Sequence, residues 1–266
     1  MQVIASIVLR SRAVPGSWAR AVPAPVAARI ERLPPSLPVD GALRLALARE
    51  ALARGDLTTA RRQISALRFS PDRLALQAQL ALRDGDWETA LRDALASEDL
   101  TTIDGLTSAL LATGDVGQAL AVQKAAVAKL VADPTQGEAL AEAEFRLGQL
   151  EERTAWDLYV GTRLRRKHES AALAAYARAS TLAPFAVRYL VAFGTQAINV
   201  DRYAAALAAF GRARAVDPTS AEPEVGLAEL ALRRGDRTAA RVALGRAQAL
   251  APRSPAVRRL AHVLAQ

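Results

Sequence analysis

The sequence predicts an all-α fold built from stacked antiparallel helix pairs, and two observations support this. Alanine supplies 61 of the 266 residues and leucine 37, whereas aromatic residues make up only 5%. Alanine and leucine favour helices, and a β-sandwich or barrel would need more of the β-branched and aromatic residues that favour strands. In the C-terminal half, the same residue types also recur at a spacing of 34, which is typical of two-helix repeats.

Residues 1–40 form a proline-rich segment that contains six of the 13 prolines. Proline blocks the interior of helices, so we expect an extended segment with at most a short helix over 26–33. An apolar run, residues 3–9, is followed by Arg10 and Arg12. Three interpretations stay open: the remnant of a membrane anchor, a segment that packs on the first repeat or on a partner, and a transit-like leader. Localisation therefore stays open between the cytoplasm, a membrane and the cell envelope.

Three short helix pairs are predicted over residues 41–134. Each pair is marked by a Gly-Asp turn, at Gly55-Asp56, Gly85-Asp86 and Gly114-Asp115, and each turn precedes an alanine at a constant distance. Glycine favours the left-handed conformation that ends helices, and aspartate forms local hydrogen bonds to the backbone. The expected first helices span 42–54, 73–84 and 101–113. The expected second helices span 58–68, 87–97 and 117–132.

Three units of 34 residues are predicted over residues 153–254. Small alanines let two helices approach closely, a larger apolar residue fills the space beside them, and a proline closes the unit. These positions are, in turn, Ala172, Ala206 and Ala240; Tyr176, Phe210 and Leu244; Ala179, Ala213 and Ala247; and Pro184, Pro218 and Pro252.

The same spacing assigns the first helices of these units and the turns that follow them. The turns are expected at residues 167–169, 201–203 and 235–237, which places His168 in a solvated turn. Two first-helix positions are then shared by Trp156, Leu190 and Glu224, and by Tyr159, Phe193 and Leu227. Trp156 and Tyr159 are accordingly expected in the core.

The period, the alanines and the closing proline together resemble the tetratricopeptide repeat, closely over 153–254 and more loosely over 41–134. The resemblance implies a right-handed α-solenoid whose first helices line a groove that binds a peptide or helix of a protein partner. The groove positions that it implies are Val191, Thr195, Ile198 and Asn199; Val225, Glu229, Leu232 and Arg233; and Asp157, Leu164 and Arg165.

Residues 135–152 interrupt the spacing and carry a net charge of −4. They are expected to be helical, either as an extension of the first helix of the fourth repeat or as a separate helix kinked near Gly148. Glu151 and Glu152 are expected at an exposed helix end. Residues 255–266 are predicted to form a capping helix that starts after Ser254 and turns Val257, Leu260 and Leu264 toward the last repeat.

The sequence carries no recognisable catalytic, metal or cofactor motif. It has no cysteine and two histidines, and it lacks GxSxG, a phosphate-binding loop and HExxH. We therefore predict that the protein is non-catalytic and has no cofactor. The resemblance to the tetratricopeptide repeat implies a scaffold or adaptor with a protein partner, a candidate subunit of a larger assembly. The alternative is a basic surface for nucleic acid or an anionic membrane, because residues 153–266 carry a net charge of +10. A ladder of Arg178, Arg212 and Arg246 is interpreted as an outward-facing feature of the repeat.

Overall fold

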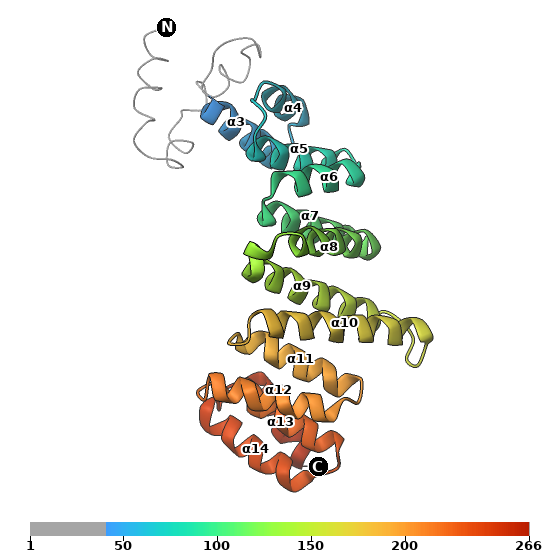
Figure 1. The fold of residues 1–266 in the computed structure, drawn as a ribbon, viewed down its shortest axis with the longest axis vertical. Helices are drawn as coiled ribbons and strands as arrows, with labels where there is room; N and C mark the ends of the chain where they lie inside the picture. The colour runs from blue at the N-terminus through green and yellow to red at the C-terminus, as the bar shows by residue number, and fades with distance from the viewer. Residues whose placement is uncertain (1–40, 266) are drawn as a thin grey trace. The chain divides into compact units, whose positions relative to one another are not determined.

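The computed structural model describes residues 41–265, which form helices joined by short turns (Figure 1). They divide into two compact units, an N-terminal unit up to Gln118 and a C-terminal unit from Ala119 onward. No strand occurs in residues 41–265. The predicted fold class, an α-solenoid of antiparallel helix pairs, is confirmed. The predictions for residues 1–40 lie outside the described part of the chain.

The N-terminal unit contains two complete helix pairs followed by the first helix of a third. α3 packs on α4, α5 packs on α6, and α7 contacts both α5 and α6. Their core is small, with Ala48, Ala51, Ala60 and Ile64 at most 2% exposed. The bounds are α3 Gly41–Arg54, α4 Leu57–Ser65, α5 Pro71–Arg83, α6 Trp87–Ser97 and α7 Leu100–Thr113.

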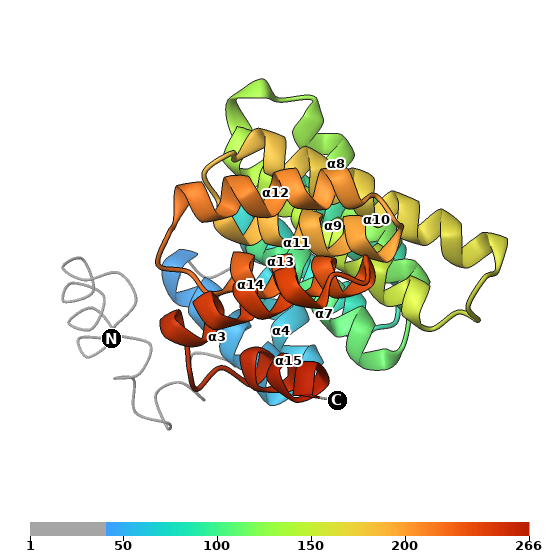
Figure 2. The same cartoon turned by 90° about the horizontal axis from the view of Figure 1, so that it is seen from below.

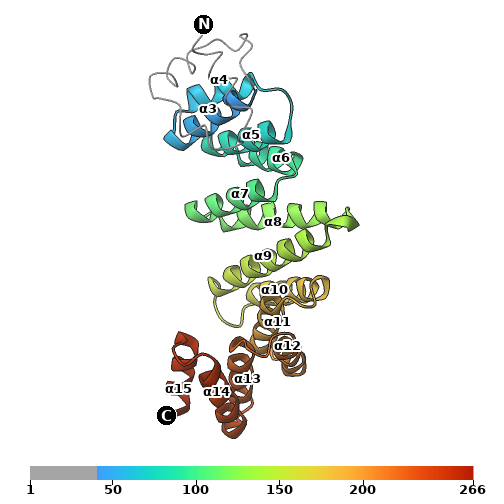
Figure 3. The same ribbon diagram turned by 90° about the vertical axis from the view of Figure 1, so that its left-hand side faces the viewer.

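The C-terminal unit holds the longer helix pairs and the cap. α8 begins just before the unit and continues into it. α9 pairs with α10, α11 with α12 and α13 with α14, and α15 packs on α13 and α14 at the C-terminal end (Figure 3). The bounds are α8 Val116–Val131, η3 Pro134–Gln136, α9 Gly137–Trp156, α10 Arg163–Leu182, α11 Val187–Asn199, α12 Tyr203–Val216, α13 Glu222–Arg233, α14 Arg237–Leu250 and α15 Pro255–Ala265.

The Gly-Asp turns connect the helices as the sequence predicts. Gly55 and Gly85 have φ values of +76° and +82°, a conformation that glycine adopts without strain. The aspartate that follows caps the next helix, because its carboxylate accepts the backbone N–H of a threonine three residues later, Thr59 or Thr89. These hydrogen bonds lower the pKa of Asp56 and Asp86. The caps therefore stabilise the fold most when the aspartates are ionised.

The fourth helix pair begins and ends at other residues than the 34-residue spacing predicts. α9 is one continuous helix and α10 already begins at Arg163, so residues 167–169 lie inside α10 and not in a turn. The turn runs over residues 157–162. Trp156 and Tyr159 are 67% and 89% exposed, so the expectation that they lie in the core is wrong.

Two ion pairs between a buried carboxylate and a half-exposed arginine show which residues of the repeats correspond. Arg178 donates from Nε and Nη2 to the carboxylate of Glu144, at 2.5 and 2.8 Å. In the sixth repeat, Arg246 lies 4.0 Å from the equally buried carboxylate of Glu224. Arg178 follows Glu144 by 34 residues, whereas Arg246 follows Glu224 by 22, so the α9–α10 hairpin is 12 residues longer. Glu144, and not Trp156, therefore occupies the first-helix position of Glu224.

The extra residues of this hairpin lie at its free end. The α9–α10 hairpin extends beyond α11 and α12 of the same unit, as Figures 1 and 2 both show. Glu151 faces the inside of the helix stack, where it binds Lys124 Nζ at 2.9 Å and His168 Nδ1 at 2.5 Å. The prediction of a solvated His168 and an exposed Glu151 is therefore wrong.

Phe210 is the centre of the C-terminal unit's packing. Its side chain is fully buried against Ile198 and Leu230 and faces two glycines, Gly194 of α11 and Gly226 of α13. A methyl group added at these glycines would lie 2.7 or 2.3 Å from the ring, closer than van der Waals contact allows. The glycines therefore make room for the aromatic side chain.

Gly226→Ala should lower the free energy of unfolding by about 1–2 kcal/mol, because overpacking outweighs the gain in helix propensity. Gly245→Ala is the matched control, since no atom lies within 4 Å of a methyl group placed there in α14. It should raise the free energy of unfolding by roughly 0.5–1 kcal/mol. Urea denaturation followed by circular dichroism measures both. Equal stabilisation by the two substitutions would show that Phe210 does not fill the space beside Gly226.

Candidate functional site

A pocket of about 280 Å³ opens in the C-terminal unit where α9, α11 and α13 end. α9 and the turn after it supply one wall, the first two turns of α10 supply another, and α11 and α13 close it. Its lining residues are Glu152, Ala155, Trp156, Val160, Gly161, Arg165, Arg166, Glu169, Gln196, Asn199 and Arg233. The pocket thus combines three arginines, two carboxylates and two amides with an exposed indole.

Hydrogen bonds between neighbouring helices hold the polar wall of the pocket in place. Gln196 Nε2 donates to the backbone oxygen of Glu169 at 2.9 Å, and Asn199 Nδ2 donates to Gln196 Oε1 at 3.2 Å. Because Gln196 is 1% exposed, this link fixes α11 against α10. Asn199 is exposed in the lining of the pocket.

The carboxylates of the pocket are already engaged by the protein. Glu169 Oε1 accepts from Arg165 Nε at 2.7 Å, and Glu152 Oε2 accepts from the Tyr176 hydroxyl at 2.8 Å. Burial and the charge of Glu152 together raise the pKa of Tyr176, so its hydroxyl stays protonated and keeps donating. Arg165 also lies 5.6 Å from the centre of the Trp156 ring, which orients the indole at the pocket edge.

Two cations of the pocket remain available to a ligand. Arg233 makes no hydrogen bond or ion pair with any residue in the described part of the chain. Arg166 uses Nη1 to bind the backbone oxygen of Gly161 at 2.6 Å and pairs with no carboxylate among residues 41–265. A guanidinium presents up to five donors, so both side chains can bind an acidic group.

Three of the positions implied by the resemblance line this pocket: Arg165, Asn199 and Arg233. Asp157 and Leu164 lie instead at the free end of the α9–α10 hairpin, and both are exposed. They are not on a first helix, because the first helix of that repeat is α9.

The remaining implied positions lie on α11 and α13. Ile198 is only 4% exposed in the cluster around Phe210, so the expectation that it faces an open groove is wrong. Val191, Val225 and Leu232 are half-buried against core clusters, and Thr195 is half-buried on α11. Glu229 lies one turn before Arg233, and partial desolvation by its neighbours raises its pKa while Arg259 and Arg233 lower it. Their role in binding stays a prediction.

Sequence reasoning missed most of the α9–α10 wall: Glu152, Ala155, Trp156, Val160, Gly161, Arg166 and Glu169. Their place in the pocket depends on the length of the hairpin, which the 34-residue spacing misassigns. The signal that could have found them is the pair Leu147-Gly148, which matches Phe193-Gly194 in the fifth repeat. That match aligns α9, and not residues 153–166, with α11.

The N-terminal unit carries a second pocket, of about 230 Å³, between α3, α5 and α7. Its lining is more apolar and includes Leu52, Leu82 and Leu106, with Arg83 at the edge. Within residues 41–265, no group of three or more histidine, aspartate and glutamate side chains could hold a metal ion. The polar pocket of the C-terminal unit is therefore the stronger candidate site.

The helices form a helical-repeat fold, and the pocket lies where the first helices α9, α11 and α13 end. Residues 198–264, from the end of α11 into α15, match the family model described as tetratricopeptide repeat. Over these residues the chain is similar to the tetratricopeptide repeat, and the helix pairs described above agree with that similarity. The comparison with curated proteins gave no match.

Several solved structures are similar to this chain at low sequence identity. PilW, titled a widely conserved type IV pilus biogenesis factor, is 16% identical and has a TM-score of 0.50, with 83% of this chain and 97% of that chain covered. Pseudomonas aeruginosa PilF is 16% identical with a TM-score of 0.47, covering 84% and 97%. The Thermus thermophilus protein TTC0263 is 20% identical with a TM-score of 0.49, covering 82% and 100%. At 16% identity, the likeness to PilW shows the fold alone.

Proposed function

We propose that this protein is a non-catalytic scaffold that holds a segment of a protein partner in the pocket of its C-terminal unit. The observation that carries this proposal is the pair of cations, Arg166 and Arg233, set beside the exposed indole of Trp156 in one pocket. Tetratricopeptide repeats are generally protein-interaction modules, which supports a protein over a small molecule.

The chemistry of the pocket favours a segment with an acidic residue next to an apolar one. The carboxylates of Glu152 and Glu169 are occupied by Tyr176 and Arg165, so they offer little to a basic ligand. The two cations can instead bind a carboxylate, and Trp156 can cover an apolar side chain. We expect the bound segment to be a helix or an extended peptide of this composition.

Arg233→Glu should weaken binding of such a segment at least tenfold, because a charge-assisted hydrogen bond is worth roughly 1.5–3 kcal/mol and the reversal adds repulsion. The probes are peptides selected from a random phage-displayed library on the full chain, and fluorescence anisotropy measures their affinity. Arg234→Glu is the matched control, because it makes the same charge change at the next residue, outside the pocket.

The control should change the affinity by less than about twofold, since exposed charges outside a contact contribute little. Selected peptides without acidic residues, or equal losses for Arg233→Glu and Arg234→Glu, would contradict the proposed site. Circular dichroism checks that both variants keep the helical content of the unchanged protein.

A further inference from the structure

The free end of the α9–α10 hairpin exposes a cluster of large apolar side chains. Tyr159 and Val160 are 89% and 85% exposed, Trp156 is 67% and Leu164 is 50%. They lie within nine consecutive residues, on a turn that joins two 20-residue helices. Burying such side chains is favourable, so a contiguous exposed cluster of them marks a surface that contacts something else. We call residues 153–167 the hairpin tip.

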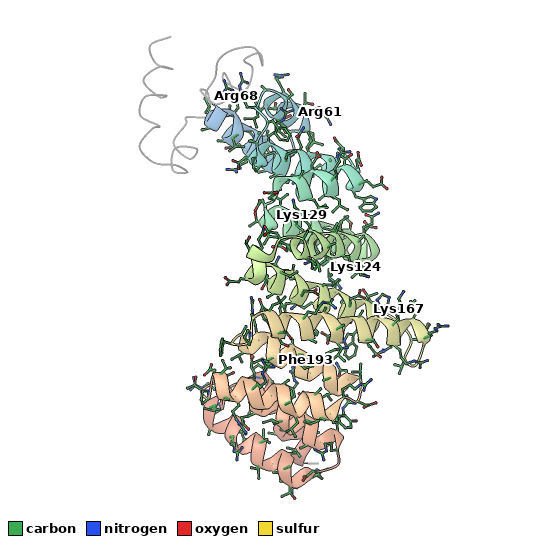
Figure 4. All side chains as sticks on the ribbon, in the orientation of Figure 1. Arg61, Arg68, Lys124, Lys129, Lys167 and Phe193 are labelled. Atoms are coloured by element: carbon green, nitrogen blue, oxygen red, sulfur yellow. The ribbon has the colours of Figure 1, made fainter. Side chains whose placement is uncertain are left out.

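The hairpin tip is also strongly basic. It carries five cations and a single acid, Asp157. Arg165 is paired with Glu169, but Arg153, Arg163, Arg166 and Lys167 form no ion pair within residues 41–265. Figure 4 shows Lys167 near the free end of the hairpin. A partner of this surface must therefore be negatively charged and must also accept apolar side chains.

The shape of the hairpin tip indicates which kind of negatively charged partner it contacts. The hairpin projects past α11 and α12, so its end is convex (Figures 1 and 2). The outer end of the turn, which carries Tyr159 and Leu164, lies outside the pocket and can enter the interfacial layer of a bilayer. Tryptophan and tyrosine prefer that layer, because their rings are apolar and their N–H and O–H groups reach water. Arginine and lysine next to them meet the lipid phosphates, whose negative surface potential attracts basic segments.

We infer that the hairpin tip docks on the surface of a membrane that contains anionic lipids. Trp156, Tyr159, Val160 and Leu164 enter the headgroup region, and the unpaired cations contact phosphates. No helix within residues 41–265 is long and apolar enough to span a bilayer, so this contact is a surface contact. The membrane contact shares Trp156, Val160 and Arg166 with the partner pocket, so the substitutions that test it are placed at Tyr159, Leu164, Arg163 and Lys167, outside that pocket.

The first test is co-flotation of the full chain with vesicles of phosphatidylcholine containing about a quarter phosphatidylglycerol, compared with phosphatidylcholine alone. The double variant Tyr159→Ser with Leu164→Ser should lower the partition coefficient about tenfold. Neither residue lines the pocket, so peptide binding should be retained. Phe185→Ser is the matched control, because Phe185 is 81% exposed in the α10–α11 turn, and it should leave the partition coefficient within about twofold.

Charge-reversal variants test whether the cations of the hairpin tip contribute to membrane binding. Arg163→Glu with Lys167→Glu should lower binding to anionic vesicles at least tenfold at low salt, and the loss should shrink as salt rises. Arg212→Glu with Arg241→Glu makes the same charge change on exposed positions of α12 and α14 and should have a far smaller effect. Binding by the tip variants equal to that of the unchanged protein would overturn the inference.

A second measurement reports insertion directly. With Trp18 and Trp87 replaced by phenylalanine, Trp156 becomes the sole tryptophan of the chain. Its fluorescence should shift to shorter wavelength on anionic vesicles and should be quenched by lipids brominated on their acyl chains. Charge-dependent binding without quenching, displaced equally by double-stranded DNA, would identify a general polyanion site and reject membrane docking. Arg233→Glu should leave the quenching unchanged, which separates this inference from the proposed partner pocket.

Discussion

Phe210→Ala should lower the free energy of unfolding by about 4 kcal/mol, the largest single-residue effect that we expect in this protein. The ring is fully buried and packs on Ala197, Ile198 and Leu230. Gly194 and Gly226 sit beside it without side chains that could move into the vacated space. The substitution therefore removes the buried ring and leaves a cavity that its neighbours cannot fill.

The loss should be local to the C-terminal unit, because each pair of a helical repeat protein contacts mainly its neighbours. Hydrogen exchange should show lost protection for the backbone amides of α11, α12 and α13, while those of α3 to α6 keep theirs. Phe185→Ala is the control, since Phe185 is 81% exposed, and it should change stability by less than about 0.5 kcal/mol. Equal effects of the two substitutions would mean that Phe210 is not the centre of this core.

Arg178→Ala should lower the free energy of unfolding by about 3 kcal/mol, because it leaves the carboxylate of Glu144 buried without a partner. Glu144 is 2% exposed and receives two hydrogen bonds from Arg178. These hydrogen bonds raise the pKa of Arg178, and burial partly opposes them. Denaturation of the full chain by urea measures the change.

Two variants distinguish this mechanism from a general loss of packing. Arg212→Ala makes the equivalent change in the fifth repeat, where the first-helix position holds Leu190 and no acid, so it should cost less than about 0.5 kcal/mol. Glu144→Leu introduced together with Arg178→Ala should recover most of the lost stability, because no charge is then left buried. If the double variant is as unstable as Arg178→Ala alone, the buried carboxylate does not explain the cost.

The 34-residue spacing predicted the repeats from α11 to the cap, because there each position has one packing role. Phe210 needs small neighbours, and the sequence shows them as alanine and glycine at fixed distances. In the cap, Val257, Leu260 and Leu264 are buried as the helical period indicates. Such positions can be inferred from residue size alone.

The fourth pair could not be predicted in the same way, because two alignments of its first helix satisfy the apolar pattern. Trp156 and Tyr159 lie at core offsets of the strict period, and the other alignment is selected by the close approach of Gly148 to the ring of Tyr176 and by the pairing of Glu144 with Arg178. The same misalignment affects the prediction of the candidate site. Arg233 and Asn199 follow from the fifth and sixth repeats, whereas Trp156 and Arg166 reach the pocket only because the hairpin is long. The grouping of the chain into segments 41–134, 135–152 and 153–254 stays a prediction.

The added length of the α9–α10 hairpin has a consequence for how such a chain can diversify. Glu144 and Arg178 keep the same pairing as Glu224 and Arg246 although 12 more residues separate them. Length gained at a free end therefore leaves the stacking of one pair on the next unchanged. The residue types at the free end are therefore not restricted by the close helix packing that requires alanine and glycine within the stack. A repeat protein can in this way acquire a new surface chemistry at one hairpin end without redesigning its core.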